Sequence, residues 1–380
     1  MIDSYALSSV AIPNLPEVRL PQEALSERLL TQLGTVFDAT VLRAMQLVVD
    51  RMLVPKPEDL EQLRASAVAL LDAELQRDPA RFFCVDADDP VAREESQLIR
   101  RSLEGGIAVE RTFLTDYAPY LSAAMLGSER DADADCIHVE HWMHTPGRPR
   151  ASVVALHGFT MGQPRIDAVV LLASQWYRRG LDVVLLTLPY HGARSPSESR
   201  FSGEHFAVPH VARMAEAVRQ AIYELRLVVR WLREQNDAPV GVLGLSLGGY
   251  LSALAATLYD DLDFVVPMVP PVCIGDLAWR FYSKSRNFDP AAEPAFSYGE
   301  LRAAFRVHSP LAHPLRVPRE RVLIVAGRGD RIVPPEHPNA LWEHWGRPAI
   351  HWYSGSHLAP FRRGRIVEAI DAHLRRVGVL

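Results

Sequence analysis

The sequence predicts an α/β protein in which helices cover both faces of a mostly parallel β-sheet, with a helical extension at the N-terminus. From about residue 106 onward, apolar segments rich in β-branched residues alternate with amphipathic helical patterns. The apolar segments are continuous, which is typical of parallel strands buried on both faces. Because ligands bind at the carboxyl ends of such strands, we look there for the functional site.

Composition restricts the class of protein. The chain has 380 residues, which suits one domain of about 250 residues with a smaller attachment. Apolar residues make up 48% and charged residues 23%, and the net charge of −5 offers no basic surface for nucleic acid. The three cysteines, Cys84, Cys136 and Cys273, are odd in number and far apart, so we expect neither a disulfide framework nor a zinc site.

The first residues and the apolar runs of the sequence indicate where the protein is expected in the cell. The first residues lack a charged segment followed by an apolar one, so we expect no signal peptide. No run of apolar residues reaches the 18 needed for a membrane span. We therefore expect a cytoplasmic protein.

The N-terminal region, residues 1–105, is expected to be a helical extension. Between residues 22 and about 105, apolar residues recur at spacings of three and four, and we find no strand pattern there. We expect this extension to pack on the main domain, residues 106–380. Three roles stay open for it: a lid, a contact between subunits of a homo-oligomer, or a contact with a lipid surface.

The main domain alternates expected strands with expected helices. The strand patterns lie at residues 135–144, 151–158, 181–189, 239–245, 263–270, 321–330 and 348–354. The helical patterns between and after them lie at residues 164–180, 208–236, 247–260 and 363–378.

The alternation stops between residues 270 and 318. This stretch is rich in aromatic residues and proline and is too long for a plain connection. We interpret it as an insertion over the strand ends, either a cap or part of a substrate-binding wall. An ordinary surface excursion with short helices is the alternative.

The strongest local signal is Gly-Leu-Ser-Leu-Gly at residues 244–248, where a strand pattern ends and a helical pattern begins. This is the pattern and the context of a nucleophile elbow. A strand that turns directly into a helix forces the joining residue, Ser246, toward positive φ. Gly244 and Gly248 allow neighbouring backbone to approach, and the Leu247 N–H points to the same place as the hydroxyl. The alternative is a serine that only caps the helix.

A serine nucleophile needs a base, and the base needs an orienting acid. Asp330 and His357 follow two later strand patterns, in the order Ser, Asp, His. We expect both side chains to lie beside Ser246. Taken alone, Asp330 could be a turn aspartate and His357 could be a surface histidine. The competing acids are Asp276 and Glu336, and the competing bases are His344 and His351.

The loop after the strand that ends at His157 is expected to supply the second donor of an oxyanion hole. Gly158 permits a tight turn, so the Phe159 N–H is the first candidate and Thr160 the next. His157, Gly158 and Thr160 are also expected at the rim of the substrate site. The first donor would be the Leu247 N–H.

Another loop, "LPYHGARSP", follows the expected strand 181–189. His191 is expected to shape this loop at the rim of the site. For Arg194 two roles stay open: binding an anionic group of the substrate, or tying the loop down. His138, His141 and His144 alternate along one strand and do not converge, so we expect no metal site.

With these residues in hand, residues 135–378 resemble the α/β-hydrolase superfamily. The matching motifs are "HGFTMG", "LPYHGARSP", "GLSLGG", "GRGDRIVP" and "GSHLAP", which occur in this order. The motif "LPYHGARSP" together with the helical extension is similar to the abhydrolase-domain-18-type hydrolases. The resemblance implies an eight-stranded sheet, acyl-enzyme chemistry and a triad of Ser246, Asp330 and His357. One residue departs from the pattern: Ser356 stands where glycine often precedes the histidine.

The expected function is that of a serine hydrolase, most specifically a carboxylesterase that acts on a small-molecule ester without a cofactor. The same site could instead cleave amides or peptides, or transfer the acyl group to another acceptor. A binding module that kept the fold without catalysis is the alternative of a different class.

Overall fold

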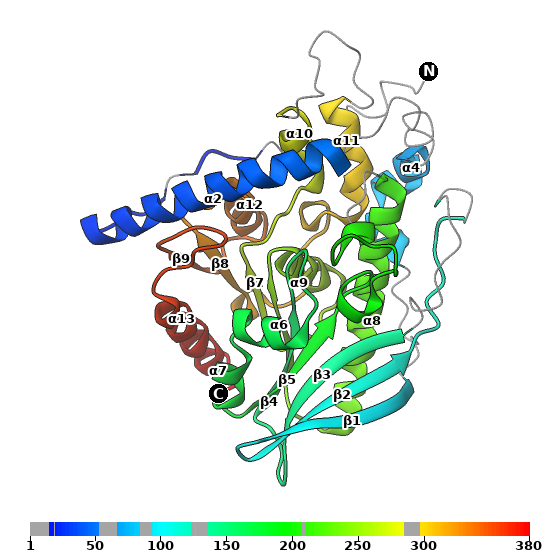
Figure 1. Ribbon diagram of the computed structural model, residues 1–380, viewed down its shortest axis with the longest axis vertical. Helices are drawn as coiled ribbons and strands as arrows, with labels where there is room; N and C mark the ends of the chain where they lie inside the picture. Colours follow the sequence, from blue (N-terminus) through cyan, green and yellow to red (C-terminus); the bar gives the residue numbers. More distant parts are fainter. Residues whose placement is uncertain are drawn as a thin grey trace.

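The computed structural model describes residues 15–18, 20–52, 67–83, 93–122, 126, 136–206, 210–284 and 297–380. One nine-stranded sheet runs through these residues in the order β1-β2-β3-β5-β4-β6-β7-β8-β9 (Figure 1). Its strands are β1 (Arg93–Leu103), β2 (Gly106–Leu114), β3 (Cys136–His144), β4 (Ala151–Leu156), β5 (Leu181–Thr187), β6 (Val240–Leu245), β7 (Val265–Met268), β8 (Leu323–Gly327) and β9 (Ala349–Tyr353).

The sheet is parallel from β5 to β9 and antiparallel only where β1, β2 and β3 join it. Every residue of β4, β5, β7 and β8 is buried, as continuous apolar strands require. The expected mostly parallel sheet is therefore confirmed.

The N-terminal region was expected to be helical up to residue 105, and this expectation is wrong for β1. The strand is exposed along most of its length and carries charged and polar residues on both faces, so it has no apolar alternation that would mark it as a strand. It pairs with β2 as an antiparallel hairpin at the edge of the sheet. The expected boundary at 105/106 therefore cuts the turn of this hairpin. Neither β1 nor β2 was among the seven expected strand patterns, and the sheet has nine strands where the resemblance implied eight.

Helices cover both faces of the sheet, as expected. One core contains the buried faces of α8 (Val211–Gln235), α9 (Leu247–Leu258) and α12 (Glu336–His344). The other core contains those of α6 (Pro164–Val170), α7 (Ala173–Tyr177) and α13 (Arg363–Arg376).

In the N-terminal region, α2 (Leu25–Met52) is a long helix and α4 (Ala73–Arg77) a short one. Helix α2 crosses the sheet at the side where β8 and β9 end (Figure 1). Among the described residues, no helix combines the length and the apolarity that crossing a membrane requires.

The expected insertion at 270–318 follows β7 and contains α10 (Ile274–Tyr282) and α11 (Tyr298–Ala304); residues 285–296 lie outside the described chain. After α11, Phe305, Val307 and Leu311 are buried in the same core as α8. This part of the insertion is therefore built into the domain, which leaves α10 and α11 as the described candidates for a cap.

Candidate active site

Ser246 lies between the last residue of β6 and the first residue of α9, at φ 55° and ψ −111°. The expected positive φ is confirmed. An L-residue in this region is strained by about 1–3 kcal/mol, so the surrounding contacts must hold it there. Its N–H donates to the Met268 carbonyl at 2.9 Å, and its carbonyl accepts from Tyr250 N–H at 2.8 Å.

The two glycines of the motif are required by close backbone contacts. A Cβ on Gly244 would lie 2.1 Å from the Gly248 carbonyl oxygen, and one on Gly248 would lie 2.1 Å from the Leu156 carbonyl oxygen. No side chain fits at either position, so β6, α9 and β4 approach one another only because these residues are glycine.

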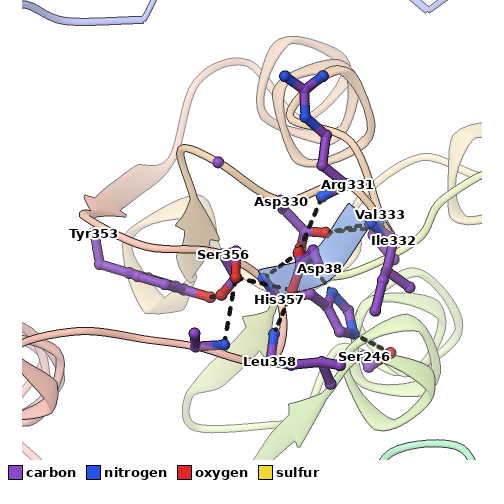
Figure 2. Close-up of polar contacts among 12 residues, drawn as sticks. Asp38, Ser246, Asp330, Arg331, Ile332, Val333, Tyr353, Ser356, His357 and Leu358 are labelled. Carbon is purple, nitrogen blue, oxygen red and sulfur yellow. Dashed lines mark hydrogen bonds and ion pairs between the residues drawn. The ribbon is translucent and has the colours of Figure 1, made fainter. Parts of the chain in front are cut away.

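His357 and Asp330 converge on Ser246 (Figure 2). The His357 Nε2 lies 2.9 Å from the Ser246 Oγ, and the His357 Nδ1 lies 2.7 Å from the Asp330 Oδ2. The other carboxylate oxygen, Asp330 Oδ1, accepts N–H groups of Ile332 at 2.9 Å and Val333 at 2.7 Å. The three side chains come from the ends of β6, β8 and β9, the edge at which sequence reasoning placed them.

The electrostatic environment favours a charged imidazole. Burial of the His357 ring lowers its pKa, but the neighbouring carboxylates of Asp330 and Asp38 outweigh burial, so the pKa is raised above its usual value. Burial raises the pKa of Asp330, while His357 opposes that shift. The arrangement can therefore accept a proton from Ser246 and stabilise the resulting imidazolium.

The competing acids and bases lie in other contacts. Asp276 accepts a hydrogen bond from the Tyr298 hydroxyl at 2.8 Å. The His344 Nε2 lies 2.9 Å from the His313 carbonyl oxygen. Glu336 begins α12, and His351 lies half-buried within β9.

The loop after β4 runs past Ser246. A Cβ on Gly158 would lie 3.7 Å from the Ser246 Cβ, so the following residue, Phe159, begins beside the serine. Met161 N–H donates to the Gly158 carbonyl at 3.3 Å, and Thr160 has φ 66°, which closes the tight turn. This geometry is compatible with the expected donor at Phe159.

His157 supports that turn through two hydrogen bonds. Its Nδ1 lies 2.8 Å from the Gly158 carbonyl oxygen, and its Nε2 lies 3.1 Å from the Leu188 nitrogen, whose N–H it accepts. The ring is buried, and burial lowers its pKa to about 4. A neutral ring with the proton on Nδ1 satisfies both contacts.

His191 and Arg194, which were also expected at the rim, are buried like His157. The His191 Nδ1 lies 2.8 Å from the Pro189 carbonyl oxygen, and its ring packs on Phe206, which fits the expected loop-shaping role. The Arg194 guanidinium donates to both Glu224 oxygens, at 2.6 and 2.7 Å. Neither side chain of this ion pair is exposed, so of the two roles left open for Arg194 the geometry favours tying the loop down.

A hollow of about 480 Å³ lies beside this loop. Gly162 and Phe201 line it, together with Gly192, Ala193 and Ser195 of the loop that holds His191 and Arg194. Ser246 and His357 are not among its lining residues. The hollow therefore does not contain the nucleophile.

Sequence reasoning missed Asp38. This residue of α2 is fully buried and accepts hydrogen bonds from Arg331, Ser356, His357 and Leu358 (Figure 2). The unusual Ser356 was the available signal, because its hydroxyl donates to Asp38 at 2.8 Å. The serine that departs from the superfamily pattern is thus explained by a partner 318 residues away.

Two family models match the sequence. The model described as alpha/beta hydrolase domain containing 18 matches residues 85–276, just over half of the chain. The model described as Serine hydrolase (FSH1) matches residues 210–369, which contain all three converging residues. The two matches overlap around Ser246.

Two curated proteins are similar to this chain in sequence. Two uncharacterized proteins of Mycobacterium tuberculosis, from strains CDC 1551 and H37Rv, are each 33% identical to the chain over 238 residues. The match covers 61% of this chain and 55% of each relative, so the chain spans little more than half their length.

Among solved structures, acetyl xylan esterase 1 from a Thermoanaerobacterium species has a TM-score of 0.51 at 17% identity, covering 87% of this chain and 98% of that one. An acetyl xylan esterase from a Paenibacillus species has a TM-score of 0.50 at 14% identity, covering 83% and 96%. At these identities the likeness concerns the fold.

Proposed function

The chain belongs to the alpha/beta hydrolase domain containing 18 family, and from this premise we propose that it is a serine hydrolase, specifically a carboxylesterase. The observation that carries the proposal is the 2.9 Å contact between the His357 Nε2 and the Oγ of a strained, half-buried Ser246. A serine that only capped α9 would need no base. Ser246 makes no side-chain cap hydrogen bond.

In acylation, His357 takes the proton of the Ser246 hydroxyl as Oγ attacks the ester carbonyl carbon. Asp330 holds the imidazole with Nδ1–H toward its carboxylate and stabilises the cation that forms. The tetrahedral intermediate then collapses, the bond to the alkoxy oxygen breaks, and His357 gives the proton to the leaving alcohol.

The negative charge on the former carbonyl oxygen needs donors at the same place. We assign this role to the Leu247 N–H, at the start of α9, and the Phe159 N–H, in the turn beside Ser246. Each such donor contributes about 10²–10³ to kcat in comparable sites. Deacylation repeats the sequence with water as the nucleophile, which releases the acid and restores Ser246.

Labelling with a fluorophosphonate tests the activated serine. We expect the purified protein to be modified at Ser246, as located by mass spectrometry, and Ser246→Ala to be unlabelled. On an ester substrate, Ser246→Ala should lower kcat by roughly 10⁶-fold, because the nucleophile is lost.

The comparison of substrates then separates the proposed ester cleavage from its rivals. Matched ester and amide substrates with the same acyl group should show faster turnover of the ester. Preferential amide cleavage would indicate an amidase, and product that depends on an added alcohol or amine would indicate acyl transfer. A folded wild-type protein that neither reacts with the fluorophosphonate nor turns over substrate would contradict the proposal.

A further inference from the structure

Helix α2 places a buried carboxylate between the loops that carry the proposed acid and base. We propose that Asp38 is a positioning residue of the active site, which fixes the backbone around His357 and adds its negative charge to that of Asp330 near the imidazole. The inference rests on the proposed function, because it assigns Asp38 to the reaction of Ser246. It also gives residues of the N-terminal region a direct part in that reaction.

The hydrogen bonds of Asp38 use both carboxylate oxygens completely. Oδ1 accepts from the Ser356 hydroxyl at 2.8 Å and from Leu358 N–H at 3.1 Å. Oδ2 accepts from His357 N–H at 2.9 Å and from Arg331 N–H at 3.1 Å. The carboxylate therefore joins the loop that carries His357, residues 354–358, to Arg331, which directly follows Asp330. We call this loop the histidine loop.

The two oxygens of a carboxylate fit these partners. Four donors point at two oxygens, so both oxygens must be acceptors. An asparagine would present an NH₂ group to two of the donors. Two buried donors would then lose their acceptor, each at a cost of about 1–3 kcal/mol, or the loop would move.

The neighbours of Asp38 on α2 are fitted to the same loops. Thr35 Oγ1 donates to the Gly329 carbonyl at 3.1 Å, directly before Asp330. A Cβ on Gly34 would lie 2.8 Å from the Ser356 nitrogen, so α2 approaches the histidine loop to backbone contact. This side of the helix is polar and small, and it matches the two loops in shape and in hydrogen bonding.

The charge of Asp38 also acts on His357. Two carboxylates act on the ring, that of Asp330, after β8, and that of Asp38, on α2. The buried Tyr353 hydroxyl donates to the Ser356 carbonyl. The Arg331 side chain points away from the cluster (Figure 2). Both carboxylates raise the pKa of His357, so removal of the Asp38 charge should lower that pKa.

The first experiment compares the pH dependence of ester hydrolysis by wild type and Asp38→Asn. His357 must be neutral to act as the base, so activity is lost as pH falls through its pKa. We expect Asp38→Asn to lower kcat by about 10²-fold with KM little changed, because the base is misplaced. The acidic limb of the pH profile of kcat, where activity falls as His357 is protonated, should move to lower pH. An unchanged kcat and an unmoved limb would overturn the proposal.

Glu27→Gln is the matched control, since it also replaces an acid by its amide on α2. Glu27 pairs with Arg362 and Arg365 on the outside of the molecule. It should leave kcat and the acidic limb as in wild type. A limb that moves equally in both variants would overturn the assignment to Asp38.

Ser356→Ala keeps the test decisive if Asp38→Asn does not fold. This change removes one donor and leaves the charge of Asp38 in place. We expect kcat to fall about tenfold with the acidic limb unmoved. A kcat equal to that of wild type would contradict the positioning role.

A measurement without turnover separates this inference from the proposed function. The His357 ring is titrated by NMR in Ser246→Ala, with and without Asp38→Asn, and its signals are identified by their absence in His357→Gln. We expect a lower pKa when Asp38 is replaced. Equal pKa values would overturn the inference even in an active enzyme, whereas a lower pKa in an inactive protein would overturn only the proposed function.

Discussion

The helices α2 and α8 are both long, and they pack on the domain in opposite ways. On α8, the apolar side chains face inward: Val218, Leu225 and Trp231 are at most 6% exposed. On α2, the inner side carries Gly34, Thr35 and Asp38, while apolar side chains face solvent. Those of Leu29, Leu33, Val36 and Phe37 are 51–66% exposed.

This difference separates two tasks. Burial of apolar area stabilises α8 on the sheet without requiring exact hydrogen-bond geometry, at about 25 cal/mol per Å². The polar inner face of α2 buries less apolar area but fixes the positions of backbone groups around His357. Damage to α8 should therefore lower stability, whereas damage to the inner face of α2 should lower turnover.

The largest loss of stability is expected at the buried ion pair between Glu224 of α8 and Arg194 of the loop LPYHGARSP, residues 188–196. Glu224→Ala leaves the Arg194 guanidinium buried without its charge partner. We expect a loss of about 3–5 kcal/mol in the free energy of unfolding, measured by chemical denaturation. Glu234→Ala, on the exposed side of α8, is the control and should change the free energy by less than about 0.5 kcal/mol. A loss below 1 kcal/mol for Glu224→Ala would contradict this role of α8.

On α2, Gly34→Ala should have the opposite effect, a large loss of turnover with a smaller loss of stability. The new Cβ would meet the Ser356 nitrogen at 2.8 Å and its Cβ at 3.0 Å, so the helix or the histidine loop must move. We expect kcat to fall about tenfold or more. The free energy of unfolding should change less than at Glu224, because the higher helix propensity of alanine, about 1 kcal/mol, offsets part of the clash.

Gly364→Ala on α13 is the matched control for this substitution. No atom lies within 4 Å of the position that its Cβ would take. It should leave kcat unchanged and leave the free energy of unfolding unchanged or slightly higher. Equal effects of the two substitutions on kcat would show that the close contact at Gly34 is not the cause of the loss of turnover.

The same comparison explains what the sequence could predict. The junction at Ser246 is local: a strand pattern, two glycines and a helical pattern lie within a few residues, so their geometry follows from chemistry along the chain. Asp330 and His357 could be placed because parallel strands end at one edge of the sheet. Each of these inferences needs only the period of the pattern and the direction of the strand.

Asp38 and β1 could not be found in this way. The contact of Asp38 with His357 spans 319 residues, and an acidic residue within a helical pattern is normally solvated. Strand β1 is polar on both faces at the edge of the sheet, so no apolar period distinguishes it. The apolar spacing correctly predicts α2 as a helix, but its outward-facing apolar side is opposite to what amphipathicity suggests.

The smallest effect is expected on the outer side of α2. Leu33 is 62% exposed, so Leu33→Ala should change the free energy of unfolding by less than about 0.5 kcal/mol and leave kcat unchanged. The same substitution at Leu225 on α8, which is 1% exposed, should cost about 2–5 kcal/mol. Chemical denaturation of both variants measures the difference directly. A cost above 1 kcal/mol at Leu33 would mean that the apolar side of α2 is covered in solution. Both helices would then bury their apolar sides, and they would differ in what covers those sides.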